Sequence, residues 1–196
     1  MKNKILNVLL IATMVLTLSS CGKVPQAKID ATNVAIEAAK VAEAPIYLPV
    51  EFTALHDSMT VINAAVENQK SKMFKKFGTI NEKLDSTIAA ANRLTIMAPI
   101  RKDEIKKNAE TLLNEVKAQI DKNAELLSKA PRGKEGAVVL ESMKADVAAV
   151  ETTTNEAQAL YDAGSYMDAL EKAKNANDKI SGVNTELTDA IAKVRR

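Results

Sequence analysis

Apolar residues recur every three or four positions along most of the chain beyond about residue 26. In an α-helix this spacing lines the apolar side chains along one face and leaves Lys, Glu, Asp and Asn on the other. The clearest stripes are Phe52, Leu55, Met59, Ile62, Val66, Gln69 and Met73; Leu140, Met143, Val147, Val150, Thr154, Ala157 and Tyr161; and Tyr166, Ala169, Ala173, Ala176, Ile180, Val183, Leu187, Ala190 and Val194. No stretch alternates convincingly with a period of two, so strands are not expected. The pattern predicts an all-α protein.

Prolines and glycines divide this pattern into six predicted helices. Proline disfavours helix in the residue before it, so breaks are expected before several prolines and at Gly78. The helices should cover about residues 26–43, 50–75, 79–97, 101–129, 137–163 and 165–193. Short connections favour antiparallel neighbours, and we therefore expect an elongated antiparallel helical bundle built from coiled-coil hairpins. We place an N-terminal helical unit at residues 26–98 and a C-terminal three-helix bundle at residues 99–196.

The turn between the last two predicted helices has readable chemistry. Gly164 can adopt the left-handed conformation that closes a helix, and Ser165 can be the N-cap residue of the next one. The surrounding residues, Tyr161-Asp162-Ala163-Gly164-Ser165-Tyr166-Met167-Asp168-Ala169, resemble the corner of a tetratricopeptide repeat. A true repeat has about 34 residues and shorter helices than those predicted here. The resemblance therefore implies a tetratricopeptide-like helical hairpin rather than a peptide-binding array.

The N-terminus has a different pattern from the body. Lys2 and Lys4 precede an almost wholly apolar run at residues 5–18. This run is shorter than the roughly 20 residues that a membrane-spanning helix needs, so it is typical of a signal-peptide core. The residues that follow, Leu18-Ser19-Ser20-Cys21, resemble the bacterial lipobox. The alternative is an ordinary secretory signal with a cysteine near its cleavage site by chance.

The lipobox resemblance implies how the chain is processed and where it resides. Residues 1–20 would be a lipoprotein signal peptide, recognised at Leu18, Ser19 and Ser20 and removed before Cys21. Cys21 would carry a thioether-linked diacylglycerol and, in many bacteria, an amide-linked acyl chain such as palmitate, with residues 21–25 as a short tether. Cys21 is the only cysteine, so it cannot form an internal disulfide. Gly22, where an aspartate would signal inner-membrane retention, favours an outer membrane and a periplasm-facing body.

Charge and composition narrow the function classes. The full chain has 27 basic and 25 acidic residues, and loss of Lys2 and Lys4 with the signal leaves 25 of each. A nearly neutral body gives no reason to expect a nucleic-acid partner. Residues 31–94, with the Ala-rich segment at 35–42, also resemble small helical envelope lipoproteins of unknown function. That resemblance implies no activity.

Residues with catalytic or ligand-binding chemistry are scarce. His56 is the only histidine, it falls off the apolar stripe, and we expect it on the surface. A site with two imidazole ligands cannot form within one chain, and Cys21 would be consumed by lipid. No glycine-rich phosphate loop has the required spacing. We therefore expect no enzyme activity and no cofactor other than the covalent lipid.

Two functions of different classes follow. The first is a lipid-anchored structural or protein-interaction module whose partners are the membrane and an unidentified envelope protein or the cell wall. Within it, Lys72, Lys75 and Lys76 are either a solvated helix end or a contact with anionic headgroups or the cell wall. The alternative is a periplasmic carrier that holds an apolar ligand inside the bundle. Its adaptable lining would be Met59, Met73, Met97 and Met143.

Overall fold

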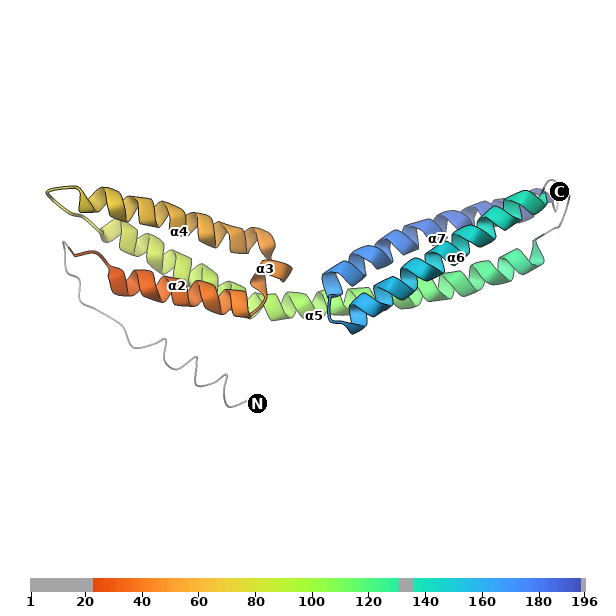
Figure 1. Ribbon diagram of the computed structural model, residues 1–196, viewed down its shortest axis with the longest axis horizontal. Coiled ribbons are helices and arrows are strands. Elements are labelled where there is room, and N and C mark those ends of the chain that lie inside the picture. The colour runs from red at the N-terminus through yellow and green to blue at the C-terminus, as the bar shows by residue number, and fades with distance from the viewer. Residues whose placement is uncertain (1–22, 131–135, 195–196) are drawn as a thin grey trace, which may run out of the picture. The chain divides into compact units, whose positions relative to one another are not determined.

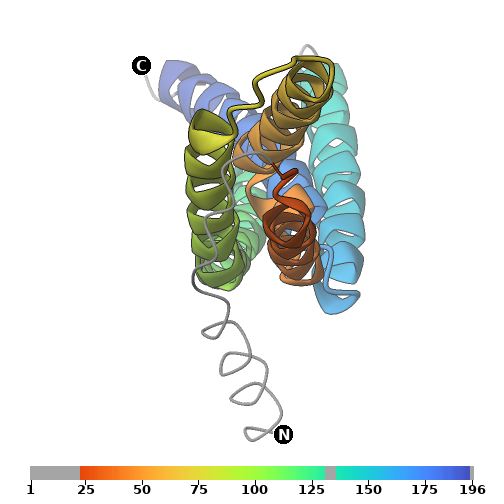
Figure 2. The same cartoon turned by 90° about the vertical axis from the view of Figure 1, so that its left-hand side faces the viewer.

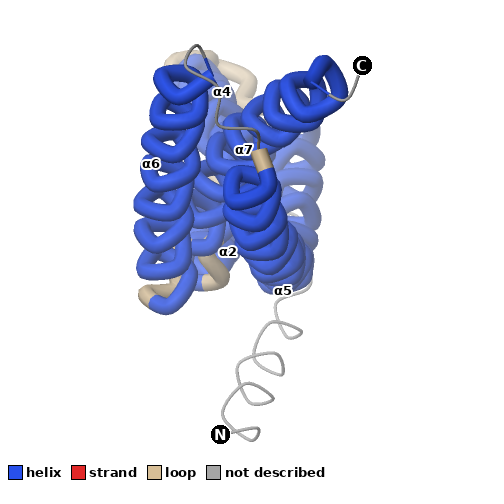
Figure 3. Tube along the Cα trace, turned by 90° about the vertical axis from the view of Figure 1, so that its right-hand side faces the viewer, coloured by secondary structure: helices blue, strands red, loops and turns tan. Residues whose placement is uncertain are grey.

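The described part of the computed structural model, residues 23–130 and 136–194, consists of helices joined by turns. The six helices are α2 (Gln26–Val41), α3 (Ala44–Tyr47), α4 (Pro49–Lys70), α5 (Gly78–Lys129), α6 (Gly136–Asp162) and α7 (Tyr166–Val194). Within these residues there is no strand, as Figures 1 and 3 show. The helices pack against one another through their apolar stripes, which confirms the predicted all-α class.

The chain forms two compact units, and neither is continuous in sequence. Of the described residues, unit 1 contains 23–38 and 51–93, and unit 2 contains 39–50, 94–130 and 136–194. Helix α5 therefore contributes its first part to unit 1 and its longer second part to unit 2. The short helix α3 belongs with the C-terminal helices rather than with its neighbours in sequence.

Unit 1 is a bundle of α2, α4 and the first part of α5. Each helix directs its stripe inward, and the resulting core includes Ile36, Ile62 and Leu84, which are at most 6% exposed. Two threonines are also buried, Thr32 at 0% exposure and Thr87 at 6%. Each hydroxyl donates to the carbonyl four residues earlier, at 2.7 and 2.8 Å respectively. The buried hydroxyls are thus satisfied within their own helices.

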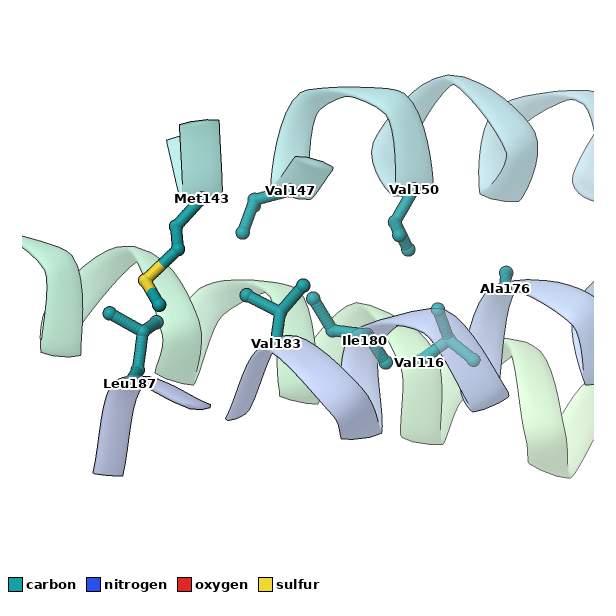
Figure 4. Packing of buried hydrophobic residues seen from close by; sticks show 8 residues of the cluster. All are labelled: Val116, Met143, Val147, Val150, Ala176, Ile180, Val183 and Leu187. Atoms are coloured by element: carbon teal, nitrogen blue, oxygen red, sulfur yellow. The ribbon is translucent and has the colours of Figure 1, made fainter. Parts of the chain in front are cut away.

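The main core of unit 2 lies between α6, α7 and the second part of α5. Figure 4 shows the cluster, in which the side chains of the three helices interdigitate. Its buried members are Val116, Met143, Val147, Val150, Ala176, Ile180, Val183 and Leu187. The two stripes predicted for the last two helices supply seven of these eight residues. This agreement shows that the apolar spacing identified the packed faces of α6 and α7.

The α6–α7 turn adopts the predicted conformation. Gly164 has a φ of 84°, in the left-handed region. Its N–H donates to the Tyr161 carbonyl at 3.0 Å, and the Ser165 N–H donates to the Leu160 carbonyl at 2.9 Å. These two hydrogen bonds form a Schellman motif. The Ser165 carbonyl then accepts from Ala169 at 2.9 Å, which places Ser165 at the N-cap of α7.

Several predicted helix boundaries are wrong. The expected break before Pro99 does not occur, because α5 runs for 52 residues with Pro99 inside it. The predicted second helix ends at Lys70 rather than at residue 75, so Met73 lies outside it. Residues 44–47, expected to interrupt the helices, form the short helix α3. The predicted loop after Ala130 falls mainly on residues 131–135, which lie outside the described part of the chain.

Candidate functional site

The predicted lipidation site lies outside the described residues. Leu18, Ser19, Ser20 and Cys21 all precede residue 23, the first residue described. Their roles therefore rest on the sequence. The first described helix, α2, begins at Gln26, five residues after Cys21.

The predicted headgroup contact falls on the loop between α4 and α5, residues 71–77. Lys72, Lys75 and Lys76 are all exposed in this loop. The prediction that they lie at the end of a helix is wrong, because α4 ends at Lys70. Between them lie Met73, 90% exposed, and Phe74, 80% exposed. Sequence reasoning assigned Met73 to the helical stripe and overlooked Phe74. The available signal was the adjacent pair itself, because two neighbouring residues cannot both continue one narrow stripe on a helix.

The ends of this loop are fixed to unit 1. Phe77 is 4% exposed and lies in the core of the unit. Lys76 donates its backbone N–H to the side-chain oxygen of Gln69 at 3.3 Å. The backbone N–H of Lys72 donates to the Gln69 carbonyl at 3.2 Å. One glutamine at the end of α4 thus holds both sides of the segment that exposes Met73 and Phe74.

A second cluster, in unit 2, gathers all three tyrosines of the chain around two lysines of α5. The Lys102 ammonium lies 5.8 Å from the ring centre of Tyr47, and that of Lys106 lies 5.5 Å from the ring centre of Tyr166. Tyr166 meets Tyr161 edge to face, with the ring centres 5.2 Å apart. These are cation–π and aromatic contacts of ordinary geometry. Tyr161 and Tyr166 belong to the predicted turn, whereas neither Tyr47 nor the two lysines was predicted to lie near it.

The surroundings of this cluster favour a charged lysine and neutral phenols. Lys102 donates a hydrogen bond to the Glu43 carboxylate at 2.5 Å, and this bond raises the pKa of Lys102. Burial of the ammonium acts in the opposite direction and partly offsets the increase. Burial raises the pKa of the Tyr47 phenol, although the charge of Lys102 acts in the opposite direction. Burial likewise raises the pKa of Tyr161. Near neutral pH the lysine is therefore a cation and both phenols are neutral, a combination that suits packing rather than proton transfer.

His56 is exposed, as predicted. Its ring meets Phe52 edge to face, with ring centres 5.0 Å apart. The neighbouring Asp57 and Ser58 face a groove of about 360 Å³ between α4 and α5 whose lining does not include His56. His56, Asp57 and Ser58 therefore do not face a common site.

A larger groove, of about 570 Å³, runs between α6 and α7 in unit 2. Its lining is mainly polar and charged and includes Asp168, Glu171 and Lys172. The Lys172 ammonium pairs with Glu156 at 2.5 Å. The groove is open and its lining residues are mostly charged, whereas small-molecule sites are usually enclosed and lined by hydrophobic and aromatic side chains.

The four methionines suggested as an apolar lining divide between the two units, with Met59 and Met73 in unit 1 and Met97 and Met143 in unit 2. Met59 is buried in unit 1 and Met143 in unit 2, at 7% and 5% exposure. Met73 and Met97 are instead 90% and 45% exposed. Met59 and Met143 are therefore on buried faces, and Met73 and Met97 are not.

The described residues contain no candidate metal site and no candidate membrane span, and no known protein matches the chain. Among residues 23–130 and 136–194, no group of three or more His, Cys, Asp or Glu side chains is placed to hold a metal ion. None of the helices in this part is both long and apolar enough to cross a bilayer. No protein family model, no curated protein and no solved structure matches the chain.

Proposed function

We propose that this protein is a bacterial envelope lipoprotein, tethered to a membrane through lipids on Cys21, whose helical body is a structural or protein-interaction module. The observation that carries the proposal is the N-terminal sequence. An apolar run of signal-peptide length ends in Leu18-Ser19-Ser20-Cys21, and the chain contains no other cysteine. The resemblance to a lipobox and the absence of any competing use for the thiol support the same assignment.

The physical role of the lipid follows from its size. Each buried methylene group contributes about 0.8 kcal/mol, so one acyl chain gives reversible binding and two or three give a firm anchor. The five residues from Cys21 to Gln26 span at most about 18 Å when fully extended. Helix α2, which begins only five residues after Cys21, belongs to unit 1 up to Ala38. Unit 1 is therefore held close to the membrane surface.

The body supplies folded surfaces rather than an evident reaction centre. Its helices pack into two units with their own buried residues, and their outer faces carry Lys, Glu, Asp and Asn. The Lys102–Tyr47 and Lys106–Tyr166 contacts join helices that are distant in sequence. A body of this kind suits binding to another envelope component, either a protein or the cell wall.

The anchor is tested by a Cys21→Ser variant compared with the parent in bacterial cells. We expect the variant to keep its leader, migrate as the longer precursor and fail to incorporate labelled palmitate, because serine offers no thiol to the diacylglycerol. A Ser20→Ala variant is the matched control, since alanine is also small, and it should be processed and labelled like the parent. Normal processing and unchanged membrane fractionation of Cys21→Ser would rule the proposal out.

The interaction role needs its own experiment. Crosslinking in intact cells that express the lipidated chain should recover a protein or cell-wall fragment above the background of a non-crosslinked sample. Separating inner from outer membranes would test the expected outer-membrane location at the same time. Recovery of no partner in repeated experiments would contradict the interaction role while leaving the anchor unaffected.

A further inference from the structure

The loop at residues 71–77 carries the most exposed large apolar side chains in the described part of the chain. Met73 is 90% exposed and Phe74 is 80% exposed. The chain has three phenylalanines, and the other two, Phe52 and Phe77, are 9% and 4% exposed. An exposed phenylalanine beside an exposed methionine is unfavourable in water unless another apolar phase covers them.

The charges around this apolar pair are predominantly positive. Residues 67–83 contain five lysines and two glutamates, a net charge of +3. One glutamate, Glu67, already pairs with Lys70 at 2.7 Å. Among the described residues, no carboxylate lies within ion-pair distance of Lys72, Lys75 or Lys76. Their ammonium groups are thus available to an external anion.

The same end of unit 1 receives the chain from Cys21. Lys28, two residues into α2, pairs with Asp85 of α5 at 2.6 Å. Asp85 lies seven residues after the start of α5, or about 10 Å along its axis. Figures 1 and 2 show the start of α2 and the α4–α5 loop at the same end of this unit. With Cys21 at most about 18 Å from Gln26, a lipid on that cysteine brings a bilayer to the loop.

We propose that residues 72–76 form a second membrane contact, in which Met73 and Phe74 enter the headgroup and upper acyl region of an anionic bilayer while Lys72, Lys75 and Lys76 bind its phosphates. The proposal rests on the lipid anchor at Cys21, which supplies the bilayer at this end of the unit. Apolar residues flanked by lysines are the composition that interfacial membrane contacts use. The lysine stems can lie along the acyl boundary with their charges at headgroup level.

The contact gives the anchor an orientation. A lipid attached at one end of the chain fixes the position of the attached unit but not its orientation to the bilayer. A second contact at the same end of unit 1 holds the axes of α4 and α5 away from the membrane plane, with this loop lowermost. The proposal therefore concerns how unit 1 is presented, beyond its attachment.

The chain has no tryptophan, so Phe74→Trp introduces a single fluorescent reporter at the loop. The mature lipidated variant would be placed in vesicles of phosphatidylglycerol and phosphatidylethanolamine, and in vesicles of phosphatidylcholine alone. We expect a blue-shifted emission in the anionic vesicles that lipids brominated on their acyl chains quench, and a smaller shift in phosphatidylcholine. Val61→Trp, at a 53% exposed position along α4, is the matched control and should report water in both.

The lysines are tested by combining Phe74→Trp with Lys72→Gln, Lys75→Gln and Lys76→Gln. Each lysine near an anionic surface contributes about fivefold to binding, or about 1 kcal/mol. The triple change should therefore reduce the ratio of inserted to free loop on the order of a hundredfold. Raising the salt concentration should reduce the insertion of the parent in the same direction, because the surface charges are screened.

The ways in which the proposal can fail are distinguishable. If the Phe74→Trp variant floats with vesicles but its indole stays in water, the loop contact is overturned and the anchor stands. If the variant does not float, both are overturned. Equal insertion into both vesicle types, unaffected by the triple change, would contradict the role of the lysines. A photoreactive residue at position 74 that crosslinks in cells to a protein instead of lipid would show that the apolar pair binds a partner chain.

Discussion

Gly164 shows how a single residue sets the turn between α6 and α7. Its φ of 84° is a conformation that residues with a Cβ adopt only at a cost. A Cβ added there would meet no atom within 4 Å, so the cost of substitution comes from the backbone and not from a clash. The sequence contained the necessary information, because a glycine at the end of a helical stripe and before a serine is a strong local signal.

We predict that Gly164→Ala lowers the free energy of unfolding by about 1 kcal/mol, the cost of forcing alanine into the left-handed region. Gly182→Ala is the matched control in α7 of the same unit. Gly182 has open space around it and ordinary helical geometry, so alanine should raise the free energy of unfolding by about 1 kcal/mol. Urea unfolding followed by circular dichroism measures both. A stabilising effect at Gly164 would contradict the assigned role of its conformation.

Phe74 and Phe77 illustrate where residue-level reasoning failed. Both lie in the lysine-rich stretch of residues 70–77, yet Phe74 is exposed and Phe77 is buried. The difference depends on where α4 ends and on the hydrogen bonds that Gln69 makes to the loop, at 3.2 and 3.3 Å. The apolar spacing alone continues the stripe from Val66 to Met73. It cannot reveal that the Gln69 side chain accepts a hydrogen bond from the backbone N–H of Lys76, seven residues ahead.

Among the elements, α5 departs most from expectation, although its own pattern was sufficient to predict it. Its buried residues include Ile80, Leu84, Thr87, Ala91, Leu94, Ala98, Ile105, Ala109, Leu113 and Val116. With the half-buried Lys102 between Ala98 and Ile105, these positions advance by three or four without interruption. The stripe therefore passes Pro99 without a change of phase. Pro99 is exposed, so the packed face on the other side of α5 continues past it, and continuity of the stripe is the better guide here than the proline.

We predict that Pro99→Ala raises the free energy of unfolding of unit 2 by up to about 3 kcal/mol. Alanine restores a backbone donor and removes the ring that crowds the preceding turn of α5. Asn108→Ala, at another exposed position of α5, is the control and should contribute only about 0.5 kcal/mol from helix propensity. Hydrogen exchange at residues 95–103 should slow in Pro99→Ala alone. Faster exchange there would mean that packing of Ala98 requires the local geometry that proline imposes.

At the scale of the whole molecule, the grouping of residues could not be derived from the order of the helices. The sequence predicts two domains that meet near residue 98, each a continuous segment of the chain. That division stays a prediction. In the structure, residues 39–50 group with the described residues from 94 onward, although residues 51–93 separate them in the chain. The physical reason lies in contacts that α3 makes with Lys102 of α5. Tyr47 lies under the Lys102 ammonium, and Glu43, just before α3, forms an ion pair with the same lysine. Stripes predict which face is buried, but they do not identify the partner helix.

This grouping predicts that Tyr47→Ala destabilises unit 2 and not the helices adjacent to it in sequence. Tyr47 is only 5% exposed, so its loss should cost about 3 kcal/mol, within the range for large buried side chains. Ile46→Ala, a 51% exposed position in the same short helix, is the matched control and should cost well under about 1 kcal/mol. Hydrogen exchange followed by mass spectrometry should show Tyr47→Ala lowering protection in α6, in α7 and in residues 102–129. Residues 51–70 should keep the protection of the parent. Loss of protection confined to residues 51–93 would instead place α3 energetically with unit 1, because local unfolding spreads first through the elements that share a core.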